Sequence, residues 1–316
     1  FWVKGDGSNH LGALQFVWNE DYAQRYDYGF SISGTEWTKI TVLWSDLIPA
    51  LSNANSKPLD PKGDRQPSKL GAMWIGKWWY WRDYAAHSYA LDDFRLEPTI
   101  AQETKDYRPA GAPLARVHAK LKAGKPITVV TMGDSLTDYK HNSNSQTNWP
   151  KFFTAAIKET YKSDVTLENP AIGGTELRQN LTMMPRWLVV QPKPDLVTVC
   201  FGGNDYASGM RGEMFTAAMK DAIQRIRRAT KGESDILVIT SMPSVESWDT
   251  MNELAEACRV AAKDQNAGLC DGFSVFHEVG KDNKERLFAD DKVHLGKPGQ
   301  EAMSKAVVDA IEKNAK

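Results

Sequence analysis

The feature that most constrains the fold is a change of hydrophobic pattern near residue 100 of this 316-residue chain. Before that point apolar and polar residues alternate, and in residues 25–32 the side chains of Tyr26, Tyr28, Phe30 and Ile32 fall on one face. A period of two is typical of a half-buried antiparallel strand. Short strands separated by Gly, Asn and Pro clusters predict a β-sandwich. Similar patterns occur at 11–18, 38–44, 70–75 and 88–96.

From residue 112 onward the pattern becomes strand, loop and helix in repeated order. Each predicted helix follows a short apolar run, so we expect a parallel sheet with helices on both faces. Residues 98–113 are rich in Pro and charge and show neither period, which predicts a linker. The expected organisation is a β-sandwich at 1–97, the linker, and an α/β domain at 114–316. The predicted helices are 148–161, 211–229, 250–265 and 298–314.

Composition excludes some classes of function. The net charge is −1, from 39 basic and 40 acidic residues, and neither sign forms a long run. Nucleic-acid binding needs a basic face and is therefore disfavoured. No apolar stretch approaches the roughly 20 residues that span a bilayer, so we expect no membrane span. The three cysteines define no disulfide framework: Cys200 fits a buried strand, and Cys258 and Cys270 could pair or stay free.

Three segments that carry polar or glycine residues each follow a predicted strand. They are Ser135 after 127–132, Gly174 after 165–169, and Asn204 after 195–201. The carboxyl ends of parallel strands meet at one edge of the sheet, where open α/β folds bind their ligands. We therefore expect these residues to lie close together.

The first of these segments, 133–136, and a fourth block, 291–294, have the chemistry of a nucleophilic triad. An alcohol such as Ser135 is a weak nucleophile and needs a base within hydrogen-bond reach, for which His294 is the candidate. The spacing Asp291-x-x-His294 lets the carboxylate accept a hydrogen bond from the second ring nitrogen. Asp290 is an alternative with a less suitable offset. Gly174 and Asn204 add a backbone N–H and a neutral amide that can donate to a developing oxyanion.

These four blocks resemble those of the SGNH hydrolases, also called the GDSL esterase family. Ser135, Gly174, Asn204 and His294 match its four signature residues in order, and the similarity covers roughly residues 112 to 316. Gly174, rather than the neighbouring Gly173, matches the signature glycine of the family, because Gly174 lies five residues after Asn169 of the same block.

The resemblance implies a flavodoxin-like three-layer α/β/α domain and catalysis by Ser135, Asp291 and His294. It also implies an oxyanion hole of the Ser135 and Gly174 N–H groups with Asn204, and no metal or cofactor. Tyr139 and His141 follow the nucleophile in a polar stretch, 138–148, which a solvated loop explains better than a substrate pocket.

Residues 1–97 are similar to the galactose-binding-like jelly rolls found among carbohydrate-binding modules. The similarity lies in the segments 1–7, 35–46 and 91–96. Five tryptophans are expected in the sandwich core: Trp2, Trp18, Trp37, Trp44 and Trp74. Three others, in the aromatic segment 77–84, are candidates for stacking on sugar rings, or for packing on the hydrolase domain: Trp78, Trp79 and Trp81.

A jelly roll joined to an SGNH domain resembles bacterial esterases that remove acetyl groups from plant cell-wall polysaccharides such as xylan or xyloglucan. The expected partner is therefore an acetylated polysaccharide or oligosaccharide. A lipid or aryl esterase, a thioesterase and a non-catalytic carbohydrate-binding protein are the alternatives. The chain starts at Phe1 within a strand-like segment. Removal of a signal peptide, which implies a secreted or periplasmic protein, or the choice of chain boundaries would explain this start. The sequence indicates no oligomeric state.

Overall fold

The computed structural model describes residues 1–50, 67–76, 85–141, 144, 147–188 and 193–316. The chain forms two compact units. Unit 1 comprises Phe1–Lys105 and Arg178–Val190, and unit 2 comprises Asp106–Leu177 and Gln191–Lys316. The two ranges of unit 1 are far apart in sequence, and α4 (Pro185–Leu188) packs on the strand β3 of this unit. The division into a domain at 1–97, a linker at 98–113 and a domain at 114–316 stays a prediction.

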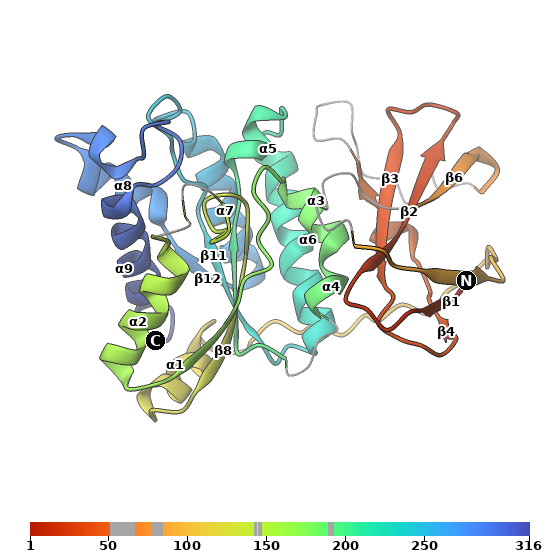
Figure 1. The fold of residues 1–316 in the computed structure, drawn as a ribbon, viewed down its shortest axis with the longest axis horizontal. Helices are drawn as coiled ribbons and strands as arrows, with labels where there is room; N and C mark the ends of the chain where they lie inside the picture. The colour runs from red at the N-terminus through yellow and green to blue at the C-terminus, as the bar shows by residue number, and fades with distance from the viewer. Residues whose placement is uncertain (51–66, 77–84, 142–143, 145–146, 189–192) are drawn as a thin grey trace. The chain divides into compact units, whose positions relative to one another are not determined.

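Unit 1 contains two antiparallel sheets, in the strand orders β4-β1-β7 and β5-β3-β2-β6. The pairing of β2 with β3 runs from Leu11 opposite Ser31 to Val17 opposite Arg25. Antiparallel sheets in this region agree with the prediction of a β domain. The strands are β1 (Trp2–Gly5), β2 (Leu11–Trp18), β3 (Arg25–Ser31), β4 (Thr38–Lys39), β5 (Ile48–Pro49), β6 (Leu70–Gly76) and β7 (Tyr89–Asp92) (Figure 1).

The core of unit 1 confirms only part of the tryptophan prediction. Trp18 is fully buried and meets Trp44 edge-to-face, with 5.1 Å between ring centroids. Trp2 and Trp44 are half-buried. Trp37 and Trp74, however, are 44% and 47% exposed, so their assignment to the core is wrong. Trp74 pairs with Gln15 and lies next to Met73, which packs on the core, so strand alternation points the indole to the opposite face.

The strand predicted over 38–44 is also shorter than expected. Only Thr38–Lys39 pairs as a strand, and a 3₁₀ turn forms at Trp44–Asp46. The carboxylate of Asp46 accepts a hydrogen bond from the Leu43 N–H at 3.2 Å. Local bonds from Asp side chains compete with sheet pairing, and here the local bond replaces the ladder.

Unit 2 contains one parallel sheet in the order β12-β11-β10-β8-β9. Numbered along the sheet's own strands this is the 2-1-3-4-5 order of flavodoxin-like folds, and it confirms the predicted α/β class. The order reverses between β8 and β10, where Gly133 lies opposite Cys200. Such a switch point is where open α/β folds bind ligands. The strands are β8 (Ile127–Gly133), β9 (Val165–Glu168), β10 (Leu196–Cys200), β11 (Asp235–Ile239) and β12 (Gly268–Cys270).

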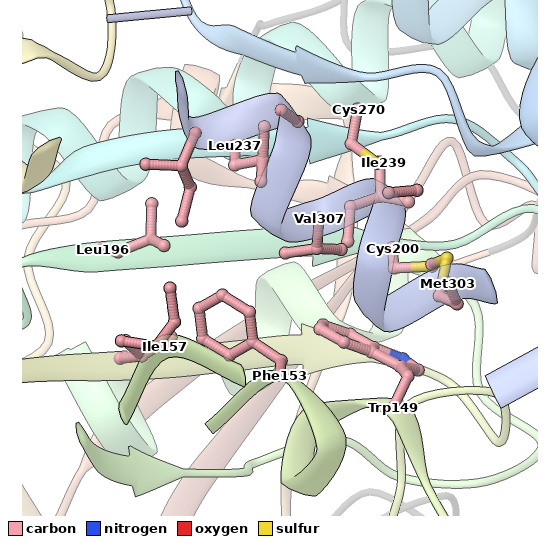
Figure 2. Close-up of a cluster of buried hydrophobic side chains, with 14 of the residues drawn as sticks. Trp149, Phe153, Ile157, Leu196, Cys200, Leu237, Ile239, Cys270, Met303 and Val307 are labelled. Atoms are coloured by element: carbon pink, nitrogen blue, oxygen red, sulfur yellow. The ribbon is translucent and has the colours of Figure 1, made fainter. Parts of the chain in front are cut away.

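Helices cover both faces of this sheet (Figure 1). Helices α1, α2, α8 and α9 pack together in one layer, and α6 packs on α7 in the other. Figure 2 shows the first layer against the strands, with Trp149, Phe153 and Val307 beside Leu196 and Leu237. Burial of these side chains is the main stabilisation of the sheet that carries the site. The helices of this unit are α1 (Ala115–Lys122), α2 (Trp149–Tyr161), α5 (Gly203–Ala207), α6 (Gly212–Thr230), α7 (Asn252–Gln265), α8 (Gly272–Gly280) and α9 (Lys297–Lys313).

Helix boundaries follow local signals in the sequence. Asn148 caps α2 by accepting a hydrogen bond from the Lys151 N–H at 3.2 Å, and Pro150 follows in the first turn. Asp271 caps α8 through the Ser274 N–H in the same way. In the sequence, a boundary between the two units falls after Leu177, the first residue of helix α3 (Leu177–Met183). Among the described residues, no helix is long and apolar enough to cross a membrane.

Candidate active site

The two strands at the switch point deliver the first candidate residues. Ser135 lies two residues beyond the end of β8, and Asn204 lies in the first turn of α5, directly after β10. Because these strands are neighbours with parallel register, both residues emerge at the same edge of the sheet. The loop after β9 brings in Gly173, since a Cβ built on it would lie 3.4 Å from the Cβ of Ser135. The structure thus brings together three segments that are far apart in sequence.

The side chains of Ser135, His294 and Asp291 form a continuous hydrogen-bond chain. The Oγ of Ser135 lies 2.9 Å from Nε2 of His294, and Nδ1 of the same ring lies 2.7 Å from Oδ2 of Asp291. An ionised carboxylate can only accept, so Nδ1 carries the hydrogen and Nε2 accepts from the serine hydroxyl. These are the distances and the tautomer that nucleophile activation requires.

A tight turn holds Asp291 in place. Its Oδ1 accepts the backbone N–H groups of Val293 and His294 at 3.0 and 2.8 Å. Lys292, which lies between Asp291 and Val293, adopts a positive φ of 60°. Desolvation raises the pKa of Asp291, but the bonds from the His294 ring and these N–H groups outweigh it and lower the pKa to about 2. The carboxylate therefore stays ionised throughout the working range. The ring bonds to Asp291 rather than to the exposed Asp290.

The turn after β8 presents the serine. Oδ1 of the buried Asp134 accepts the Leu136 N–H at 2.9 Å, and its backbone carbonyl accepts the Thr137 N–H at 3.0 Å. These two hydrogen bonds stabilise the tight turn that contains Ser135. Burial raises the pKa of the Asp134 carboxyl to about 6. This aspartate therefore bonds backbone groups around the site.

The candidate oxyanion donors differ in whether their N–H groups already donate a hydrogen bond within the protein. The Gly173 N–H donates to Oδ2 of Asp138 at 3.0 Å. Within the described part of the chain, by contrast, the N–H groups of Gly174 and Ser135 have no acceptor. Gly174 has a φ of 77°, which favours glycine. The geometry thus favours Gly174 over Gly173 as the second backbone donor.

Asn204 has one amide hydrogen engaged, and the other has no acceptor among the residues that the structure describes. Its Nδ2 donates to the carbonyl of Thr175 at 3.0 Å, which ties α5 to the residue after Gly174. The preceding turn depends on Gly202, whose φ is 147°, and a Cβ there would lie 2.2 Å from Oγ of Ser241. A glycine is therefore required for the chain to turn from β10 into α5.

Asp205 follows Asn204 and is fully buried. Its Oδ1 accepts the Leu177 N–H at 2.9 Å, whereas its Oδ2 has no partner among the described residues. A charged carboxylate oxygen without a donor is costly in an apolar environment, and burial raises the pKa of Asp205 to about 8. The folded protein therefore holds a proton here at neutral pH.

This proton links stability to pH with a definite sign. The ordinary pKa is 3.8, so between pH 4 and 8 the unfolded chain releases a proton that the folded protein retains. The free energy of unfolding should therefore fall as the pH rises through this window, by up to about 1.4 kcal/mol per pH unit. Asp205→Asn should remove this component, because the amide is always neutral and can still accept the Leu177 N–H.

Chemical denaturation at pH 5, 6, 7 and 8 tests the prediction. The variant should gain stability relative to wild type as the pH rises, while Asp249→Asn, which alters an exposed carboxyl, should follow wild type. Asp134 adds the same trend to every protein in the series and cancels in the comparison. Parallel curves for Asp205→Asn and wild type would show that Asp205 is ionised in the folded state.

His141 is a component of the site that the sequence interpretation missed. Its ring stacks on that of His294, with 4.5 Å between centroids and 26° between planes. Its Cδ2 would lie 2.8 Å from a Cβ on Gly173. The solvated loop favoured for this residue is therefore wrong. Neither spacing nor periodicity marks this histidine, because it reaches the site through the turn after the nucleophile. Tyr139 instead faces the Lys151 ammonium, 5.4 Å from its ring centroid.

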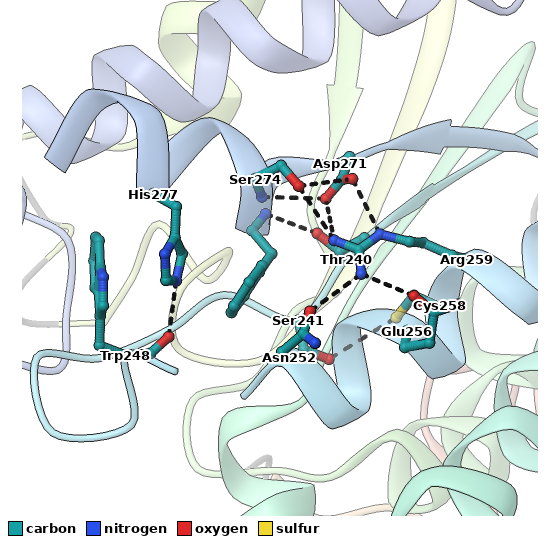
Figure 3. A network of polar contacts seen from close by, with 11 residues as sticks. Thr240, Ser241, Trp248, Asn252, Glu256, Cys258, Arg259, Asp271, Ser274 and His277 are labelled. Atoms are coloured by element: carbon teal, nitrogen blue, oxygen red, sulfur yellow. Dashed lines mark hydrogen bonds and ion pairs between the residues drawn. The ribbon is translucent and has the colours of Figure 1, made fainter. Parts of the chain in front are cut away.

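A polar network supports the segments next to the turn that carries Asp291 and His294 (Figure 3). Arg259 of α7 bonds both carboxylate oxygens of Asp271 at the start of α8, at 3.0 and 2.9 Å. His277 of α8 stacks on Trp248 and bonds its carbonyl at 2.9 Å. The loop that carries Trp248 also meets the turn that carries Asp291 and His294, since the Val245 N–H donates to the Lys292 carbonyl at 3.0 Å.

Other predicted features have different outcomes. Trp78, Trp79 and Trp81 lie outside the described residues. The three cysteines are all buried and free, so Cys258 and Cys270 do not pair. Burial raises the pKa of each of these two thiols to about 12, which makes them unreactive. Among the residues that the structure describes, no cluster of His, Cys, Asp or Glu could hold a metal ion.

Comparisons with known proteins identify the family of the domain that carries this site. The sequence model of the GDSL-like lipase/acylhydrolase family matches residues 131–302, which include all three triad residues. Among solved structures, the acetylxylan esterase Axe2 from Geobacillus stearothermophilus is similar, with 20% identity and a TM-score of 0.52 over 60% of this chain and 96% of that one. A single-site variant of Axe2 matches with a TM-score of 0.50, again at 20% identity, over 60% of this chain and 95% of that one. No curated protein matches the sequence. Since the family model covers more than half of the chain, this protein belongs to the GDSL-like lipase/acylhydrolase family of carboxylic ester hydrolases.

Proposed function

We propose that this protein is a serine esterase that removes O-acetyl groups from a plant cell-wall polysaccharide such as xylan or xyloglucan. The observation that carries the proposal is the hydrogen-bond chain from Ser135 through His294 to Asp291, with spacings of 2.9 and 2.7 Å. The similar fold of an acetylxylan esterase supports the substrate class. A secreted or periplasmic location and a sugar-binding role for Trp78, Trp79 and Trp81 belong to the same proposal.

The geometry supports a two-step reaction. The Ser135 oxygen attacks the acetyl carbonyl carbon while its proton passes to Nε2 of His294. The Ser135 and Gly174 N–H groups and the Asn204 amide stabilise the resulting oxyanion. On collapse, the sugar oxygen leaves and takes the proton from His294, which leaves an acetyl-serine. Water then attacks this ester with His294 as base, and the second collapse returns the proton to Ser135 and releases acetate.

The surroundings of the nucleophile support a small acyl group. The ring of His141 lies against both His294 and Gly173, and Gly173 approaches the Cβ of Ser135. These groups occupy one side of the serine, so a long acyl chain would have to leave the site in another direction. An acetyl group needs no long channel for its single methyl group, whereas a fatty acyl chain needs a long apolar channel.

Rates on p-nitrophenyl esters of increasing chain length test the proposal. We expect kcat/KM to be highest for acetate and to fall at least about tenfold by butyrate, since discrimination by steric fit is worth roughly 1–3 kcal/mol. Acetylated xylo-oligosaccharides should be deacetylated as well. A preference for octanoate, with no acetate released from the oligosaccharides, would identify a lipid esterase. Binding of the oligosaccharides without turnover would identify a carbohydrate-binding protein.

A further inference from the structure

The turn that follows the nucleophile carries a carboxylate to which the triad assigns no role. Asp138 lies one turn beyond Asp134, whose carbonyl accepts the Asp138 N–H at 2.9 Å. Oδ1 of Asp138 accepts the Lys140 N–H at 2.8 Å and closes a local turn. Oδ2 has a different partner: it accepts the Gly173 N–H at 3.0 Å, across 35 residues of sequence.

Within the described residues, hydrogen bonds at three positions join the nucleophile turn to the loop that carries Gly174. The Ile172 N–H donates to the Gly133 carbonyl at 3.2 Å, and the Asn169 amide donates to the Thr137 carbonyl at 2.9 Å. The third is the bond from Gly173 to Asp138. It alone uses a carboxylate acceptor, which makes it the strongest type of the three, and it alone acts on the residue next to Gly174.

A pair of adjacent glycines needs such a restraint. Glycine has access to more backbone conformations than any other residue, and two in a row multiply this freedom. Gly174 must nevertheless hold a φ of 77° for its N–H to stay in one place. An oxyanion donor is effective only when it is fixed before the charge develops. The bond at Gly173 fixes the preceding peptide group and engages its N–H, which leaves the Gly174 N–H for the substrate.

We propose that Asp138 is a positioning residue that holds the Gly173–Gly174 turn in the conformation required for the oxyanion hole. It acts through the loop and does not touch the substrate. The inference rests on the proposed assignment of Gly174 to the oxyanion hole. The hydrogen bond, rather than the charge, carries the effect, because a negative charge near a developing oxyanion is unfavourable. An asparagine has one acceptor oxygen, which can take the Gly173 N–H if the side chain gives up the local bond to the Lys140 N–H. It should therefore largely replace the aspartate, and an alanine should not.

The experiment compares Asp138→Ala and Asp138→Asn with wild type on p-nitrophenyl acetate. Loss of one oxyanion donor costs roughly 10²- to 10³-fold in kcat, and a donor that is loosened rather than removed should cost less. We expect kcat to fall roughly 10- to 50-fold in the alanine variant, with KM within about twofold, and the asparagine variant to stay within about threefold of wild type. Asp106→Ala is the matched control, because Asp106 closes the same kind of turn with the Arg108 N–H at 2.9 Å.

Two readouts separate positioning from a general structural role. A trifluoromethyl ketone forms a tetrahedral oxyanion adduct with a catalytic serine, so its inhibition constant should rise in the same ratio as kcat/KM falls. Hydrogen exchange at the Gly173 amide should accelerate in Asp138→Ala and stay slow in Asp138→Asn. This second readout does not depend on turnover.

The outcomes are distinct from those of the proposed function. An inactive wild type would overturn the esterase assignment, and exchange at Gly173 would still test the contact. An active wild type with Asp138→Ala within about threefold of its kcat would overturn the positioning role. Equal losses in the alanine and asparagine variants, or an inhibition constant that does not follow kcat/KM, would overturn it as well.

Discussion

Ser135→Ala should abolish ester hydrolysis and leave the fold intact. Its hydroxyl is the only group of the side chain that the site uses, through the 2.9 Å contact with His294. In serine hydrolases, loss of the nucleophile costs on the order of 10⁵- to 10⁶-fold in kcat, because the remaining donors cannot replace the covalent step. Stopped assays with p-nitrophenyl acetate should therefore show turnover at the level of the buffer.

A thermal melt of the same variant is the control for folding. Removal of one half-buried hydroxyl should change the melting temperature by only a few degrees, roughly what a loss of 1 kcal/mol produces. A covalent fluorophosphonate probe should label wild type and fail to label the variant. Residual activity above about one per cent of wild type, in a preparation free of other esterases, would exclude Ser135 as the nucleophile.

Asn204→Ala should give the second largest loss, roughly 10²- to 10³-fold in kcat, if the amide donates to the oxyanion. The prediction has a structural complication, since the same amide also donates to the Thr175 carbonyl at 3.0 Å. Truncation removes both bonds, and the loss of a hydrogen bond to the backbone costs about 1 kcal/mol in stability. KM should change little, because the oxyanion exists only in the transition state.

Asn314→Ala separates the two effects. Asn314 also donates its amide to backbone carbonyls, those of Leu269 and Ala310, at 3.0 and 2.7 Å. It should lower the melting temperature and leave kcat unchanged. If Asn204→Ala behaves in the same way, with kcat within about threefold of wild type, then Asn204 is a structural residue and not an oxyanion donor.

The sequence predicts the parallel α/β domain well because its signals are local. The runs before Ser135 and Asn204 are mostly apolar and β-branched, as is typical of buried parallel strands, and they form β8 and β10 as neighbours at the switch point. The spacing of Asp291 and His294 likewise fits within a single turn. Each of these features depends on a few consecutive residues, whose identities are enough to predict the local backbone geometry.

Features that depend on long-range packing are not visible in the sequence. The stack of His141 on His294 joins residues more than 150 positions apart, and no periodicity marks it. The exposure of Trp74 follows from which face of an edge strand it occupies, and a one-residue change of register would reverse it. Residues Arg178–Val190 group with the β unit although they lie within the segment that matches the esterase family.

The most direct test of the central claim follows acetyl groups on acetylated xylan by NMR in the presence of wild type or Ser135→Ala. Acetylated xyloglucan, pectin and peptidoglycan serve as parallel substrates. The account predicts that wild type converts the acetyl resonances of a plant polysaccharide into free acetate, and that Ser135→Ala leaves them unchanged. Acetyl resonances that persist on every polysaccharide with wild type, while p-nitrophenyl octanoate is cleaved, would contradict it.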